Sequence, residues 1–179
     1  MASTLIASNR LELPLLTRPQ LERLAAGDAD RVAAELNATI PDAWRDDVRR
    51  LAAYRARQLA ERPQDAPWLL RAIVRTDTRE VIGYLNFHAG PDDRGMVEIG
   101  YTLLPAGRGL GYAIEAVRAA MDWAARTHGV KVLRASVAPD NERSLNLIRK
   151  LGMVKVGEQM DPEDGLEHVY EREVGETNA

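Results

Sequence analysis

The spacing of hydrophobic and polar positions divides the chain into a helical N-terminal part and a strand-rich remainder. Arg10 to Leu16 is predicted as a first strand, because Leu11, Leu13 and Leu15 fall on one face. Thr17 and Gln20 then have the spacing of a capping box, which marks a helix start. Apolar positions at helical spacing predict three helices, which cover about residues 18–26, 29–37 and 42–62.

From Trp68 onward the period of the pattern changes to two, which is typical of strands. Three strands are predicted at Trp68–Arg75, Glu80–His88 and Met96–Leu104, separated by polar turns, and they form an antiparallel meander. A glycine-rich connection leads into a helix over about 109–127. A strand (130–137), a helix after Asn141 and two strands (153–158 and 166–173) follow. This order predicts a single mixed α/β domain.

Composition and charge exclude several classes of protein. The chain has 179 residues, 45% of them hydrophobic, which is enough for one sizeable core. It contains no Cys, so a disulfide scaffold, a cysteine nucleophile and a thiolate metal site are excluded. Its 24 basic and 27 acidic residues give a net charge of −3, which offers no general attraction to nucleic acid or to a membrane surface. Because the first residues lack the long apolar core of an export signal and no apolar run reaches membrane-spanning length, we expect a cytoplasmic protein.

The strongest chemical signal is the loop between the meander and the following helix. It reads Arg108-Gly109-Leu110-Gly111-Tyr112-Ala113. Glycines let a backbone turn tightly near a ligand, and a helix N-terminus offers unpaired N–H groups to phosphate. Arg108 adds a charged donor at the rim. The alternative is that the glycines serve only strand-to-helix packing, and the loop alone does not decide between the two.

Two segments of the sequence resemble the GNAT family of N-acetyltransferases. The segment from Val97-Glu98-Ile99-Gly100-Tyr101 through Arg108 to Ala116 is similar to the family's acetyl-CoA-binding segment, in which Arg108, Gly111 and Ala113 match the motif. Asn141 to Ser144 and Lys150-Leu151-Gly152-Met153 resemble its later Asn-x-x-Ser and Leu-Gly-Phe segment. The resemblance covers Arg10 to about Tyr170 and is nearest to the subgroup of ribosomal-protein-alanine N-acetyltransferases.

The resemblance implies a fold and a site for acetyl-CoA. The fold is a mixed, mostly antiparallel sheet with flanking helices, in which the fourth strand (Met96–Leu104) and the fifth strand splay apart. The family's pantetheine arm pairs with the fourth strand, here near the backbone of Leu103. The pyrophosphate is held by Arg108, Gly109, Leu110, Gly111, Tyr112 and Ala113. Asn141 would contact the pantetheine or hold the splay, although a plain helix cap also explains it.

Glu98 is the candidate general base. An ammonium cannot attack a thioester until something accepts its proton. Glu98 lies in mid-strand between apolar residues, where partial desolvation would raise its pKa. Period-two alternation places Tyr101 on the opposite face of the strand. The alternative is a surface carboxylate that pairs with a basic neighbour.

A second group could protonate the departing thiolate. Many family members carry a Tyr seven positions after the Asn, but this sequence has Ile148 there. Ser144 is the available hydroxyl, as in the ribosomal-protein subgroup. A thiol with a pKa of about 8.5 also leaves acceptably without help, and a first-turn hydroxyl is often satisfied locally.

Tyr84, Asn86 and His88 share a strand face and are expected to line the acceptor pocket beside Glu98. A lone His is more often structural or exposed than catalytic, and this is the alternative interpretation of His88. No His pair or carboxylate pair has convincing metal-ligand spacing, and we predict no metal. The helices over 18–62 are expected on the acceptor side and residues 68–173 form the cofactor-binding core.

We therefore expect an acetyl-CoA-dependent N-acetyltransferase. It would act on a primary amine, either a protein N-terminus or a small molecule, by direct attack in a ternary complex. A non-catalytic acyl-CoA-binding module and a phosphate-binding protein of another fold remain as alternatives. Homodimerisation is common in the subgroup and is left open.

Overall fold

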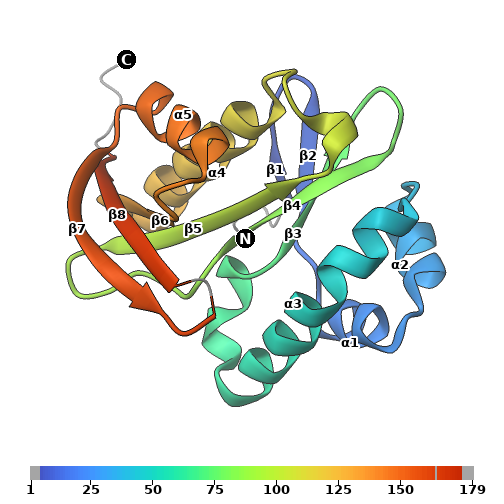
Figure 1. The fold of residues 1–179 in the computed structure, drawn as a ribbon. Coiled ribbons are helices and arrows are strands. Elements are labelled where there is room, and N and C mark those ends of the chain that lie inside the picture. The colour runs from blue at the N-terminus through green and yellow to red at the C-terminus, as the bar shows by residue number, and fades with distance from the viewer. Residues whose placement is uncertain (1–4, 164, 175–179) are drawn as a thin grey trace.

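The computed structural model describes residues 5–163 and 165–174. Within these residues, eight strands form one open sheet in the order β1-β2-β3-β4-β5-β6-β8-β7 (Figure 1). The strands are β1 (Leu5–Ala7), β2 (Leu11–Pro14), β3 (Arg71–Arg75), β4 (Val81–Phe87), β5 (Met96–Leu103), β6 (Val132–Val137), β7 (Val154–Asp161) and β8 (Gly165–Glu173). The helices are α1 (Arg18–Ala26), α2 (Ala29–Leu36), α3 (Asp42–Glu61), α4 (Tyr112–His128) and α5 (Glu142–Lys150).

The helices cover both faces of the sheet. The helices α4 and α5 lie on one face and α1 to α3 on the other (Figure 1). Alternate residues of the central strands enter the two cores, so that Ile73 packs with α4 and its neighbours Ala72 and Val74 pack with the N-terminal helices. Burial of both apolar layers is the main stabilising contribution to such a sandwich.

The strands β5 and β6 part in the middle of the sheet. Their parallel pairing runs from Met96 opposite Val132 to Glu98 opposite Arg134. Beyond this point β5 stays with β4 as far as Leu103, and β6 stays with β8 as far as Val137. The expected splay of the fourth and fifth strands is therefore confirmed, with these strands now numbered β5 and β6.

Three predictions at the element level need correction. The strand β1 precedes the first predicted strand and has only three residues, too few for a readable alternation. Trp68 does not begin a strand, because Pro63–Trp68 is a 3₁₀ helix with Pro at both 63 and 67, and Pro cannot donate to a sheet ladder. The helix α4 begins at Tyr112 rather than near Gly109, since Gly109 and Gly111 have φ of +77° and +82°.

Several local predictions are confirmed. The Thr17 N–H donates to Gln20 Oε1 at 2.9 Å at the start of α1, and Gly27 ends that helix in a left-handed conformation. The meander of β3, β4 and β5 is antiparallel throughout. Among the described helices, none has the length and apolar character needed to cross a membrane.

Candidate functional site

A glycine-containing turn joins the end of β5 to the N-terminus of α4. Gly109 and Gly111 both adopt positive φ, at +77° and +82°, a region that other residues rarely enter. The turn therefore brings its backbone N–H groups next to the first turn of α4, whose own N–H groups have no partner within the helix. This arrangement, at the positive end of a 17-residue helix, suits a phosphate group.

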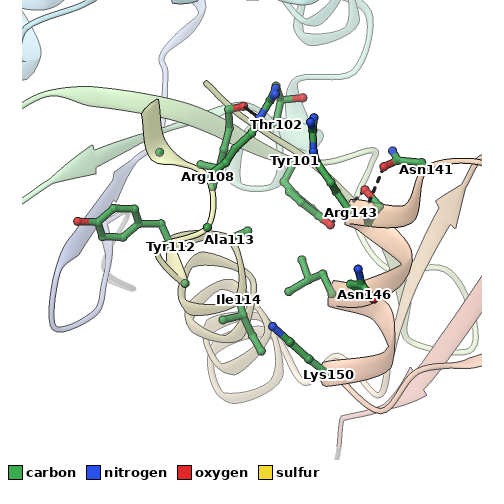
Figure 2. A pocket seen from close by; sticks show the side chains of 16 residues that line it. Tyr101, Thr102, Arg108, Tyr112, Ala113, Ile114, Asn141, Arg143, Asn146 and Lys150 are labelled. Atoms are coloured by element: carbon green, nitrogen blue, oxygen red, sulfur yellow. Dashed lines mark hydrogen bonds between the residues drawn. The ribbon is translucent and has the colours of Figure 1, made fainter. Parts of the chain in front are cut away.

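A pocket of about 390 Å³ opens at this turn. In Figure 2 the segment with Arg108, Tyr112 and Ala113 borders one side of the pocket, and α5 borders the other. The pocket is lined by Tyr101, Thr102, Leu103, Gly107, Arg108, Gly109, Gly111, Tyr112, Ala113, Ile114, Asn141, Arg143, Ser144, Asn146, Leu147 and Lys150. It lies where β5 has left β6, so the strand end, the glycine turn and α5 meet there.

Most residues expected to bind the cofactor line this pocket. Leu110 does not, because its side chain is 55% exposed and its carbonyl accepts a hydrogen bond from Arg10 at 3.1 Å. Arg108 points back along the chain, and its Nε donates to the Leu103 carbonyl at 2.9 Å. The Arg108 side chain thus covers the strand end at which the pantetheine contact was expected.

Asn141 caps α5 as its sequence position predicts. Its Oδ1 accepts a hydrogen bond from the Ser144 N–H at 3.2 Å. The Ser144 hydroxyl in turn accepts a hydrogen bond from the Tyr101 hydroxyl at 3.3 Å, which links α5 to β5 across the pocket. Ile148 is only 2% exposed in the core, and this position carries no hydroxyl.

Glu98 lies on the other face of β5, as the alternation predicts. Val97, Ile99 and Leu103 enter the core beneath α4, whereas the Glu98 carboxylate is 19% exposed on the α3 side. The Ser136 hydroxyl donates to Glu98 Oε1 at 2.6 Å. His88 Nδ1 lies 3.8 Å from Glu98 Oε2.

His88 and Glu98 are neighbours across two paired strands. The His88 N–H donates to the Glu98 carbonyl at 2.9 Å, which fixes the two side chains on the same face. Partial burial lowers the pKa of His88, Glu98 opposes this shift, and the Arg55 guanidinium adds to it. The lowered pKa favours the neutral imidazole, although the side chain is 49% exposed, and a neutral imidazole nitrogen can accept a proton.

A buried polar network supports this face from α3. Arg55 donates through Nε to Asn86 Oδ1 at 3.1 Å and through Nη1 to the His88 carbonyl at 3.2 Å. Gln58 donates to the same carbonyl at 3.0 Å. Asn86 is 4% exposed, so it holds the wall of this face rather than opening onto solvent.

Gly100 makes room for the network on β5. A Cβ at this position would lie 3.1 Å from Asn86 Nδ2 and 3.2 Å from His88 Nε2. These distances are tighter than ordinary van der Waals contact. A larger residue at this position would therefore push against the Asn86 and His88 side chains, and glycine leaves them their present places.

Tyr84 is the third residue expected on this face, and it is half-buried against the N-terminal helices. Burial raises the pKa of its hydroxyl, which lies near Thr102 and Asp47. Tyr84 therefore stays protonated at neutral pH. It stands beside the part of β5 that borders the cofactor pocket.

Sequence reasoning missed the basic face of α5. Arg143, Asn146 and Lys150 recur at helical spacing and line the pocket (Figure 2). The sequence could have predicted them from their helical spacing in the segment after the glycine turn, since Arg and Lys on one helix face suit an anionic ligand. Over residues 5–163 and 165–174, no three side chains of His, Cys, Asp or Glu gather as a metal site, and the absence of a metal stays a prediction.

Comparisons with known proteins identify the family of the chain. The family model described as "Acetyltransferase (GNAT) domain" matches residues 10–154. The uncharacterized N-acetyltransferase YjdG of Bacillus subtilis is 28% identical over 151 residues, 84% of this chain and 89% of that protein. The uncharacterized N-acetyltransferase YoaA of Bacillus subtilis is 35% identical over 85 residues, 48% of each chain.

Solved structures show the same fold at low sequence identity. The ribosomal-protein-S5-alanine acetyltransferase of Vibrio fischeri superposes with a TM-score of 0.66 at 17% identity, over 94% of this chain and 96% of that one. The Microcin C7 self immunity acetyltransferase MccE, solved with acetyl-CoA and AMP, has a TM-score of 0.64 at 14% identity, over 93% and 94%. Because this family model matches residues 10–154, most of its length, the chain belongs to the GNAT family of acetyltransferases.

Proposed function

We propose that the protein transfers an acetyl group from acetyl-CoA to a primary amine by direct attack in a ternary complex. The observation that carries this proposal is the parting of β5 and β6 after Glu98 and Arg134. It leaves a phosphate-suited pocket on one face of β5 and a carboxylate–imidazole pair on the other. Two substrates can therefore reach one point of the strand from opposite faces.

The residues of the pocket fit acetyl-CoA. The left-handed glycines 109 and 111 form a cradle at the N-terminus of α4 that suits a pyrophosphate. Arg143 and Lys150 on the facing helix supply positive charge for further phosphate oxygens. Bound acetyl-CoA supplies an acetyl group activated as a thioester.

Glu98 and His88 serve the amine. Glu98 accepts the proton of the incoming ammonium, directly or through a water molecule, so that the amine nitrogen can attack the acetyl carbon. Ser136 holds the Glu98 carboxylate in place through its 2.6 Å hydrogen bond. Neutral His88 stands beside the carboxylate as a relay toward solvent.

Ser144 and Tyr101 serve the leaving group. The Ser144 hydroxyl donates its proton to the departing sulfur, and the Tyr101 hydroxyl bonds to Ser144 from behind. Burial raises the pKa of Tyr101, so its hydroxyl stays a donor at neutral pH. Ile148 in place of the family's usual Tyr is the observation that favours the second candidate, a weakly active acyl-CoA-binding module.

A thiol-release assay separates the two candidates. We expect free thiol to form from acetyl-CoA in proportion to an amine added from a panel of N-terminal peptides, amino acids, polyamines and aminoglycosides. Gly111→Trp is the matched control, since a residue with a side chain at this left-handed position strains the turn that forms the cradle. CoA binding without thiol release for any amine would support the binding module. CoA binding that is unchanged in a folded Gly111→Trp variant would contradict the proposed cofactor site.

A further inference from the structure

Arg10, in the turn between β1 and β2, ties the glycine turn to the helix that follows it. Its Nη1 donates to the Leu110 carbonyl at 3.1 Å. Its Nε and Nη2 lie 2.7 and 2.6 Å from Glu115 Oε2 on α4. One guanidinium therefore bridges the turn and the first turns of α4.

Glu115 is itself held on several sides. Its Oε1 accepts hydrogen bonds from the Ser8 hydroxyl at 2.7 Å and from the Arg10 N–H at 2.9 Å. The carboxylate side chain is 18% exposed. A partly buried carboxylate with this many donors is a rigid anchor, because charge-assisted hydrogen bonds are the stronger ones.

The Arg10 guanidinium also packs over the ring of Tyr112. Its central carbon lies 4.5 Å from the centre of the Tyr112 ring, within the range of a cation–π contact. Tyr112 is 6% exposed, so the ring does not move freely. The Arg10 Nη2 also lies 3.4 Å from the place of a Cβ on Gly111, which puts it directly against the turn.

Apart from the Arg108 bond to the Leu103 carbonyl at its start, the turn has few side-chain contacts of its own. Gly109 and Gly111 lack side chains, and the Leu110 side chain is 55% exposed. Glycine loses more conformational freedom than other residues when it is ordered. If this freedom were lost only when a ligand binds, the ligand's affinity would fall by the same free energy.

We propose that Arg10 is a positioning residue that holds the glycine turn ready for the pyrophosphate of CoA, through its bridge between Leu110 and Glu115. This inference rests on the proposed function, because it assumes that the turn binds CoA. Arg10 does not line the pocket and acts through the turn alone. A Lys could not replace it, because a single ammonium lacks the planar fork that reaches both partners.

Two measurements on purified Arg10→Ala test the proposal. Calorimetric titration with CoA should show affinity about tenfold weaker than wild type, the loss expected for one bridging hydrogen bond with its preorganisation. Amide hydrogen exchange without ligand should be faster in residues 108–113 and unchanged in the C-terminal half of α4. Arg10→Lys should recover only part of the affinity.

Arg75→Ala is the matched control. Its guanidinium lies 5.6 Å from the same Tyr112 ring, and its side-chain hydrogen bonds go to Asp77. The control removes the same charge near the turn, and its CoA affinity should stay within about twofold of wild type. An equal loss of CoA affinity in Arg10→Ala and Arg75→Ala, or wild-type affinity in Arg10→Lys, would show a general effect of charge. Either result would overturn the proposed role of the bridge.

The two hypotheses fail in different ways. Unchanged CoA affinity in Arg10→Ala, with wild type binding CoA, overturns the positioning role and leaves the proposed function standing. If wild type binds no CoA, the proposed function fails, and the positioning role for CoA fails with it. Exchange that speeds up across the whole chain would show a plain loss of stability and would also overturn the inference.

Discussion

The Ser136 hydroxyl donates a 2.6 Å hydrogen bond to Glu98 Oε1, at the point where β6 leaves β5. Ser136 lies just beyond the last parallel pair, Glu98 and Arg134, so the bond spans the start of the splay. It leaves Oε2 of the carboxylate, beside His88, as the oxygen available to an amine or water.

Replacement of Ser136 by Ala should therefore lower turnover without weakening CoA binding. The Glu98 carboxylate would lose the hydrogen bond that orients it. A hydrogen bond to a charged group contributes about 1.5–3 kcal/mol, which is the upper limit of the expected effect. We expect kcat to fall by about tenfold. Kinetics at saturating acetyl-CoA measure this effect, and an unchanged kcat would show that Ser136 does not orient the base.

Replacement of Ser144 by Ala should give a defect that depends on the leaving group. The Ser144 hydroxyl, backed by Tyr101 at 3.3 Å, serves the departing sulfur and not the amine. The defect should shrink with the selenoester analogue of acetyl-CoA, because a more acidic leaving group needs less help. Tyr101→Phe should show the same trend more weakly. Equal defects with both donors would remove Ser144 from the leaving-group step.

Glu115 should make the stability of the protein depend on pH in the acid range. Partial burial acts to raise its pKa, but hydrogen bonds from Ser8 and Arg10 outweigh burial and hold the pKa below its ordinary value. A lowered pKa in the folded state stabilises the protein above the unfolded-state pKa of about 4.3, and this stabilisation is lost as pH falls through the folded-state value. Urea unfolding of wild type and Glu115→Gln should differ most near neutral pH and converge in acid. A difference that does not change with pH would contradict the carboxylate's role.

The sequence predicts the strand face of Glu98 and the glycine turn, because both depend on neighbours in the chain. Period-two alternation separates Glu98 from Tyr101, and two glycines before a helix mark the cradle. The cap of α5 by Asn141 is local in the same way.

The contacts that hold these parts in place join distant segments and could not be predicted from the sequence. Arg10 and Glu115 are 105 positions apart, and Arg55 and Asn86 are 31 apart. Neither pair leaves a periodic signal, since each depends on how a helix packs against the sheet. The prolines at 63 and 67, in the 3₁₀ helix before β3, similarly overrode the strand pattern at Trp68.

The central claim is that Glu98 accepts the proton of an amine during acetyl transfer. The most direct test is the pH dependence of kcat/KM for wild type and Glu98→Gln, with an acceptor amine from the thiol-release panel. We predict that Glu98→Gln keeps its affinity for CoA, loses about 10²–10⁴-fold in rate near neutral pH, and recovers as pH approaches the pKa of the amine. Equal rates and equal pH profiles for the two proteins would contradict the claim and leave Glu98 a structural carboxylate of β5.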